Sequence, residues 1–291
     1  MDILFDFNIV LIIEMILRGC AMIGLEFPDV SPIIFSIGPV AIRWYSMAYL
    51  VGIILAWLLI KRNIKKYDLP LDSDKLEDLV FYITLGIIIG GRLGYVLFYG
   101  GNSFWRNPVQ ILEVWKGGMS FHGGVLGVIV GAYLFARKVK YKFLGITDLV
   151  VLYAPIGIFC GRLANFINDE LWGRVTDVAW AVRFPNGGYL PRHPSQLYEA
   201  FFEGVVIFVV LNWLWKYKFV RERNGFVSAL FVLLYGVFRV SMEQFREPDE
   251  QLGFFFGNMT MGQILSLPLI LVGLGIIVYL CWRKKDTMLL R

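Results

Sequence analysis

Three polar side chains stand on one face of a strongly hydrophobic segment, where they could do chemistry. Arg162, Asn165 and Asp169 follow the apolar run 145–159 at positions i, i+3 and i+7, which share one face of a helix. An arginine at membrane depth costs about 2.5–3.5 kcal/mol on insertion scales, so it needs a partner or a function. We therefore expect this face to contact protein or water rather than lipid. Polar packing between helices is the alternative explanation.

Similar polar groups recur in other hydrophobic segments, at the same predicted membrane depth. They are Tyr45, Arg92, His122, Asn168, Glu199, Glu203, Arg239, Glu243 and Arg246. The other half of the segments is plain hydrophobic, which predicts a polar cavity that opens on the outer side only, because an ion pathway needs polar groups at several depths. Four arginines against three glutamates leave a surplus of positive charge. This surplus could receive an anion such as a lipid phosphate, which a guanidinium grips with two hydrogen bonds.

The two histidines stand beside hydrophobic segments. His122 lies in the glycine-rich stretch 117–124, where free backbone N–H groups favour an anion, and His193 lies just before a hydrophobic segment. A capping or hydrogen-bonding role is the alternative for each. The three cysteines are scattered without a paired spacing, so the sequence indicates neither a disulfide framework nor a metal site, and we expect no cofactor.

The composition is that of a polytopic membrane protein. Of 291 residues, 57% are hydrophobic and 18% are charged, whereas soluble domains average about 25% charged. The net charge of +5 comes from short clusters beside apolar runs, which is typical of membrane topology rather than of nucleic-acid binding.

Seven hydrophobic segments are expected to form membrane-spanning helices in an all-α fold. They are residues 44–60, 79–99, 123–135, 146–168, 196–214, 226–245 and 263–281. Basic clusters follow the first, third, fifth and seventh segments, so the positive-inside rule places the N-terminus outside and the C-terminus in the cytoplasm. We expect an N-terminal extension or surface helix over 1–26, a seven-span domain over 27–285 and a cytoplasmic tail over 286–291. Residues 26–39 contain three prolines and are expected to form a surface or re-entrant arm.

Several long motifs carry a resemblance to a known family. They are Phe-Ser-Ile-Gly-Pro at 35–39, Trp-Tyr at 44–45, Gly-Gly-Arg-Leu-Gly-Tyr at 90–95, Gly-Gly-Met-Ser-Phe-His-Gly-Gly at 117–124, Gly-Arg-Leu-Ala-Asn-Phe-Ile-Asn-Asp-Glu-Leu-Trp-Gly-Arg at 161–174, Arg-His-Pro-Ser-Gln-Leu-Tyr-Glu at 192–199 and Phe-Arg at 238–239. This set, in this order, closely resembles the bacterial prolipoprotein diacylglyceryl transferases.

The resemblance implies a seven-span inner-membrane enzyme. It implies transfer of the diacylglyceryl group of phosphatidylglycerol to the lipobox cysteine of a prolipoprotein signal peptide, which yields a thioether and glycerol-1-phosphate. Bilayer lipids surround such an enzyme, and its active site faces the outer leaflet. The positions that match the important residues of the family are Tyr45, His122, Arg162, Asn165, Gly173 and Arg239, with Glu243 and Arg246 nearby.

The expected roles follow from this chemistry. A thiolate is the attacking species, so His122 is the candidate base, although it could instead bind the headgroup or the peptide. Arg162 and Arg239 are expected to hold the phosphate, while Tyr45, Asn165 and Glu243 orient the lipid and the arginines. Four further residues are expected to support the site: Arg92, Asn168, His193 and Glu199.

Three positions depart from the usual family pattern. Ala164 and Asp169 stand where glycine is usual, and Arg43 stands where histidine is frequent. Ala164 is a mild change if the backbone there is helical, whereas Asp169 could pair with Arg162 or face the outer water. A lipid or small-anion transporter and a lipoprotein-binding scaffold without catalysis are the rival functions.

Overall fold

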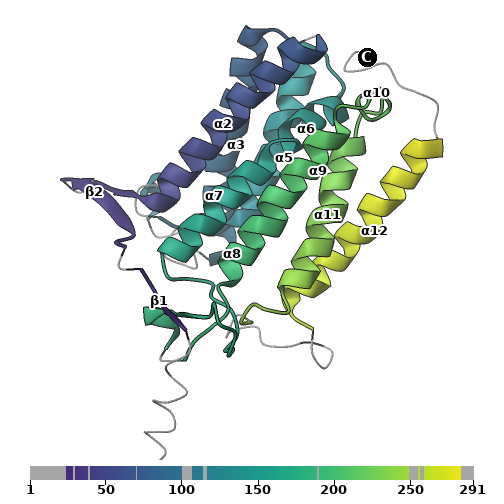
Figure 1. The fold of residues 1–291 in the computed structure, drawn as a ribbon. Helices are drawn as coiled ribbons and strands as arrows, with labels where there is room; N and C mark the ends of the chain where they lie inside the picture. Colours follow the sequence, from purple (N-terminus) through teal and green to yellow (C-terminus); the bar gives the residue numbers. More distant parts are fainter. Residues whose placement is uncertain are drawn as a thin grey trace, which may run out of the picture.

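The computed structural model describes residues 24–28, 30–38, 40–69, 71–99, 107–113, 117–188, 190–248, 255 and 259–282. The expected N-terminal extension lies almost wholly outside these residues, and so does the expected tail over 286–291. The described part of the chain is mostly helical and forms a set of long helices that lie side by side (Figure 1).

Every predicted hydrophobic segment is helical. The helices are α2 (Trp44–Tyr67), α3 (Ser73–Tyr99), α5 (Phe121–Val139), α6 (Phe143–Val151), α7 (Ala154–Ile167), α8 (Ser195–Glu199), the π-helix η4 (Ala200–Val206), α9 (Ile207–Leu214), α10 (Lys218–Arg221), α11 (Phe226–Met242) and α12 (Met261–Trp282), with short 3-10 turns η1 (Pro108–Leu112) and η3 (Pro185–Gly187). Among the described residues, four helices are long and apolar enough to cross a bilayer. They are α2, residues 74–99 of α3, the continuous run α8–η4–α9, and α12.

The predicted fourth segment is a broken helix. Helices α6 and α7 together pass the same test of length and composition, but they bend by 41° at the break, which gives a fifth candidate span if the pair counts as one. Pro155 lies in the first turn of α7. Proline has no backbone N–H to continue the hydrogen bonds of a preceding helix, so a new helix begins here at an angle.

Glycines let helices α3 and α5 pack closely against each other. A methyl group at Gly86 would collide with the backbone of Gly127, and one at Gly90 would collide with the backbone of Gly123. Such small residues let two helix backbones pack directly against each other in a membrane.

The two ends of the helices differ in chemistry. The basic residues Lys61, Lys65, Lys138 and Lys218 lie where α2 and α5 end and where α10 begins, and we call this the basic end. The hydrophobic core cluster that includes Phe135, Ile146 and Leu149 lies toward it. The strands and α8 lie at the opposite end (Figure 1).

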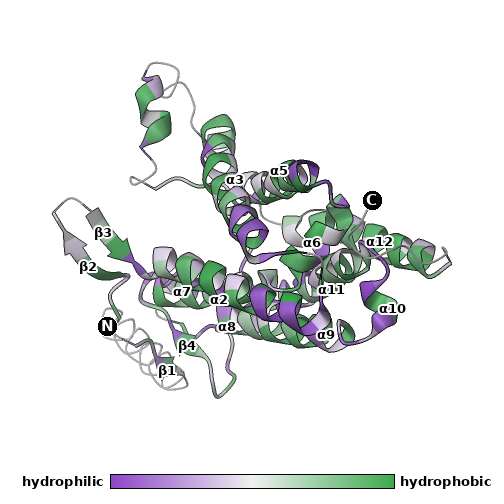
Figure 2. Ribbon diagram, turned by 90° about the horizontal axis from the view of Figure 1, so that it is seen from above, coloured by the Kyte–Doolittle hydropathy of each residue, from purple (hydrophilic) through white to green (hydrophobic). Residues whose placement is uncertain are grey.

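Two small strand pairs lie at that opposite end, which the all-α expectation did not include. Strand β2 (Ile33–Ile37) pairs antiparallel with β3 (Val40–Arg43), and β1 (Leu25–Glu26) pairs parallel with β4 (Val182–Arg183). The β2–β3 hairpin projects from the rim of the helices (Figure 2) and turns at Gly38, whose φ of +57° suits glycine. The proline-rich stretch is therefore an arm without a helix in its described residues, as expected.

The half of the segments near the basic end is not plain hydrophobic, so that expectation is wrong. Asp148 of α6 is buried, and its carboxylate accepts hydrogen bonds from the backbone N–H groups of Gly225 and Ser228, at 2.7 Å each. These N–H groups lie at the start of α11 and have no partner within that helix. Asp148 therefore caps a neighbouring helix, a contact that spacing within its own segment does not indicate.

Candidate functional site

Six charged side chains from separate parts of the chain meet near the end of the helices opposite the basic end. This polar cluster consists of Arg162, Glu199, Glu203, Arg239, Glu243 and Arg246. The Arg162 guanidinium forms an ion pair with Glu199 at 2.8 Å and donates a hydrogen bond to Glu203 at 3.2 Å. The Arg239 guanidinium lies 2.9 Å from Glu199 and 2.8 Å from Glu243. Arg246 completes the cluster at 3.5 Å from Glu199.

Close helix packing brings these groups together. Glu199 ends α8, and Glu203 lies in η4, whose π-helical turns are frequent at functional sites. A methyl group at Gly204 would lie 2.7 Å from the Cβ atom of Phe159 on α7. The absence of a side chain at Gly204 therefore lets η4 approach α7 closely enough for Arg162 to reach both glutamates. On the other side, the start of α12 closes over Glu243 at Gly262.

The glutamates lie at the centre of the polar cluster and the arginines lie at its edge. The side chains of Glu199 and Glu203 have no exposed surface, whereas those of Arg162 and Arg239 are 16% and 14% exposed. An anion that approaches the cluster therefore meets guanidinium groups first. Arg162 and Arg239 lie 2.8 and 2.9 Å from Glu199, so two forked donors lie close enough together to bind one phosphate.

The expected surplus of arginine is absent from this cluster. Its three guanidinium groups balance three carboxylates. Arg92, the fourth expected arginine, instead donates to the backbone carbonyls of Ile111, Gly117 and Gly118 at 2.6–3.0 Å. Arg92 therefore shapes the segment before α5. The sequence could not show which neighbours Arg92 contacts, because they lie in a segment 19–26 residues away.

Known proteins match the part of the sequence that carries the polar cluster. The sequence model of the prolipoprotein diacylglyceryl transferases matches residues 32–279. The chain belongs to this family. A relative from Rickettsia felis, named phosphatidylglycerol–prolipoprotein diacylglyceryl transferase, is 51% identical over 250 residues, which cover 86% of this chain and 96% of the relative. A relative of the same name from Rickettsia bellii is 48% identical and covers 87% of this chain and 97% of its own length.

Membership of the transferase family confirms the resemblance that the motifs indicated. The family match includes each residue of the polar cluster, and it starts after residues 1–31. The names of these relatives are those of an enzyme. The long apolar helices of this chain are those expected of a membrane protein.

Two asparagines of the longest family motif hold a glutamate beside the polar cluster. Asn165 is buried and donates to the carboxylate of Glu170 at 2.7 Å, and Asn168 donates to the same oxygen at 3.3 Å. The backbone carbonyl of Glu170 in turn accepts from the amide of Gln196 at 2.7 Å. Asn165 therefore links the end of α7 to the start of α8.

The two residues of this motif that depart from the family pattern, Ala164 and Asp169, lie in different backbone conformations. Ala164 lies inside helix α7, where alanine is favourable, so the change there is mild as expected. Asp169 adopts a left-handed backbone with φ of +54°, a conformation that glycine adopts freely and that aspartate tolerates. Its carboxylate accepts from the N–H of Asn186 at 2.6 Å. Asp169 therefore anchors the following loop. Burial raises the pKa of Asp169, while the Asn186 hydrogen bond opposes this change.

Gly173 joins three segments through its backbone. Its N–H donates to the carbonyl of His193, and it forms a bridge with Arg246. A methyl group at Gly173 would lie 2.5 Å from the carbonyls of both His193 and Phe245. The position therefore holds Arg246 in place through backbone contact.

Tyr45 and His122 lie at helix starts, outside the ion pairs of the polar cluster. Tyr45 lies in the first turn of α2, and its ring packs against that of Tyr49. Helix α2 packs along α7, the helix that carries Arg162. His122 is exposed in the first turn of α5, and its described ring contact is with Phe121. The structure thus gives His122 free access to a ligand but no hydrogen-bonded partner among the described residues.

His193 belongs to an aromatic group in the loop before α8. Its Nδ1 lies 3.2 Å from the hydroxyl of Tyr198, and its ring packs against Phe245. Burial lowers the pKa of His193 below 6.5, so the neutral imidazole is favoured at neutral pH. His193 therefore packs between the loop that carries Gly173 and the segment after α11 that carries Arg246.

Sequence reasoning gave too little weight to two glutamates. Glu203 was expected among the polar groups of the cavity but without a role of its own, and it pairs with Arg162. Glu170 was not expected at the site, and it accepts from both asparagines. A spacing of four from Glu199 marks Glu203 as a neighbour on the same helical face. No comparable spacing marks Glu170, because it follows the helix end and the turn determines where it lies.

Proposed function

We propose that this chain transfers the diacylglyceryl group of phosphatidylglycerol to the lipobox cysteine of prolipoprotein signal peptides. In this reaction the cysteine thiolate attacks the glycerol carbon that bears the phosphodiester. A carbon–sulfur bond forms, the carbon–oxygen bond breaks, and glycerol-1-phosphate leaves with the bonding electrons. The family match and the names of the relatives support this substrate pair.

The pairing of Arg162 and Arg239 with one shared glutamate carries the proposal. Both guanidinium groups are partly exposed, and Glu199 holds them at 2.8 and 2.9 Å. The phosphate of the donor lipid binds to their exposed edges, and the same donors then stabilise the charge that develops on the leaving phosphate. Glu199 and Glu243 hold the guanidinium planes in the orientation that this contact requires.

The other residues have supporting roles in the proposed reaction. His122 accepts the proton of the substrate thiol, because imidazole is the side chain that changes charge near neutral pH. Tyr45 and Asn165 orient the lipid headgroup. Gly173 and Arg246 close the polar cluster, while Asn168 and His193 support the loops around it.

We also propose that the protein is a seven-span protein of the bacterial inner membrane. The basic end faces the cytoplasm, the N-terminus lies outside, and the polar cluster opens as a cavity toward the outer leaflet. The gathering of basic residues at one end of the helices supports this orientation. Reporter fusions after residues 67, 139 and 217 should all give a cytoplasmic signal. A fusion after residue 180 should give an external signal.

The decisive experiment combines purified protein, phosphatidylglycerol and a synthetic lipobox peptide. We expect the peptide to gain the mass of one diacylglyceryl group and glycerol-1-phosphate to appear in equal amount. A peptide in which serine replaces the lipobox cysteine is the matched control and should gain nothing. Binding of the peptide without release of glycerol-1-phosphate would instead indicate a scaffold. Movement of intact lipid or anion across proteoliposomes, without peptide modification, would indicate a transporter.

A further inference from the structure

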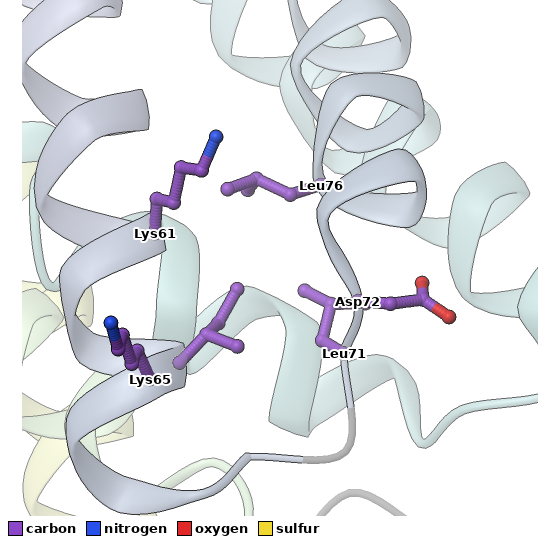
Figure 3. Close-up of a pocket in the computed structure, with 6 residues that line it drawn as sticks. Lys61, Lys65, Leu71, Asp72 and Leu76 are labelled. Atoms are coloured by element: carbon purple, nitrogen blue, oxygen red, sulfur yellow. The ribbon is translucent and has the colours of Figure 1, made fainter.

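A separate cavity lies at the basic end, away from the polar cluster. It has a volume of about 350 Å³ and is lined by Lys61, Ile64 and Lys65 of α2, by Leu71 and Asp72 of the connection, and by Leu76 of α3. Figure 3 shows Lys61 and Lys65 on one wall and Leu71 and Leu76 on the facing wall. Nothing in the proposed transfer reaction uses this cavity.

The cavity carries positive charge without a neutralising carboxylate. Among the described residues, no carboxylate forms an ion pair with Lys61 or Lys65. The Asp72 carboxylate points away from the cavity (Figure 3) and pairs with Lys75 at 3.3 Å. The ammonium group of Lys61 lies 5.4 Å from the ring of Trp57, a contact that holds this side chain without removing its charge.

The wall that faces the two lysines is apolar. Leu71 and Leu76 are almost fully buried, and both belong to the hydrophobic core. The lysines lie directly after the apolar run 44–60, so the cavity stands at the depth where lipid headgroups meet acyl chains. A ligand with one anionic group and an adjoining apolar part fits both walls, whereas a free anion uses only the lysine wall.

We propose that this cavity binds the phosphate headgroup of an anionic phospholipid from the leaflet at the basic end. The phosphate lies between the ammonium groups of Lys61 and Lys65. The glycerol and the first methylene groups of the acyl chains pack on Ile64, Leu71 and Leu76. Basic pockets between helices at this membrane level are known to bind anionic headgroups. Because the cavity stands apart from the polar cluster, its lipid is a bound partner of the protein rather than the donor substrate.

The test uses the full chain in detergent and phosphatidic acid as the probe, with bound lipid counted by native mass spectrometry. The double variant Lys61→Gln, Lys65→Gln removes both ammonium groups. We expect its affinity for the probe to fall about 30-fold, since each lysine near an anionic headgroup contributes about a fivefold factor. The matched control is Arg62→Gln, Lys66→Gln, which removes the same charge from the same helix end outside the cavity lining. This control should retain the lipid.

A second variant tests the cavity without changing charge. Ile64→Trp fills the space while both lysines remain, and we expect it to lose the lipid as well. Equal losses in the two double variants would show attraction by general charge and overturn the proposal, and so would full retention in Lys61→Gln, Lys65→Gln. Displacement of phosphatidic acid from the wild type by millimolar inorganic phosphate would assign the site to a soluble phosphate and overturn the lipid assignment. Retention of lipid in the presence of phosphate supports it.

Discussion

Arg162→Ala tests whether this arginine serves the lipid or only its glutamate partners. The wild-type side chain contacts Glu199 at 2.8 Å and Glu203 at 3.2 Å, and both carboxylates are fully buried. Removing one partner of a buried ion pair leaves an uncompensated charge, which costs about 3–5 kcal/mol. Loss of a donor to the developing phosphate charge lowers the rate by about 10²–10³-fold. The single variant should therefore lose both stability and transfer.

The double variant Arg162→Ala, Glu203→Gln separates these two effects. It removes one guanidinium and one carboxylate charge, so Arg239 and Arg246 again balance Glu199 and Glu243. Thermal unfolding in detergent should return most of the way toward the wild-type midpoint. Transfer to the lipobox peptide should stay about 10²–10³-fold below wild type, because no neighbouring group replaces the lost donor.

If the double variant transfers the diacylglyceryl group at the wild-type rate, Arg162 does not bind the phosphate. Its whole function would then be to pair with the glutamates. Unchanged stability in the single variant would refute the electrostatic argument. Lys138→Ala is a suitable control for stability, because its 2.7 Å pair with Asp78 is about half exposed on both sides. Such surface pairs contribute about 0–1 kcal/mol.

The remaining predictions concern one donor geometry, one backbone contact and the two histidines. Arg162→Lys should transfer poorly, because one ammonium cannot span the two contacts of the fork, and wild-type rates in the peptide assay would contradict this. Gly173→Ala should lower the unfolding midpoint and transfer together, since its methyl group would lie 2.5 Å from two carbonyls. If His122 is the base, His122→Gln should lower transfer and remove one ionisation from its pH profile, whereas an unchanged profile would exclude this role. Burial lowers the pKa of His193, so the unfolded chain binds more protons at mildly acidic pH. The contribution of His193 to the free energy of unfolding is therefore full above about pH 6.5 and is lost as the pH falls. His193→Gln should therefore show a smaller fall in unfolding midpoint between pH 7 and pH 5.5 than wild type, and equal falls would contradict the sign.

The positions of the helices could be predicted from the sequence because hydrophobic length and basic flanks are local properties. All seven predicted segments are helical, and the arm over 26–39 has no helix in its described residues. The break between α6 and α7 was missed, although Pro155 marks it. The capping of α11 by Asp148 was missed for a different reason, because it joins residues about 80 positions apart.

For the candidate site, too, some features could be predicted from the sequence and others could not. The predicted topology indicated that Glu199, Arg239 and Glu243 lie on the same side of the membrane, and the family motifs added the expected substrate. Only the tertiary structure decided which of these groups meet. Arg162 and Arg239 share one glutamate, whereas Arg92 turns to backbone carbonyls of the segment before α5. The depth of a residue in a membrane follows from its position along one helix. Which residues form ion pairs depends instead on how separate helices rotate and pack against each other. Contacts such as that of Gly204 with Phe159 determine this packing.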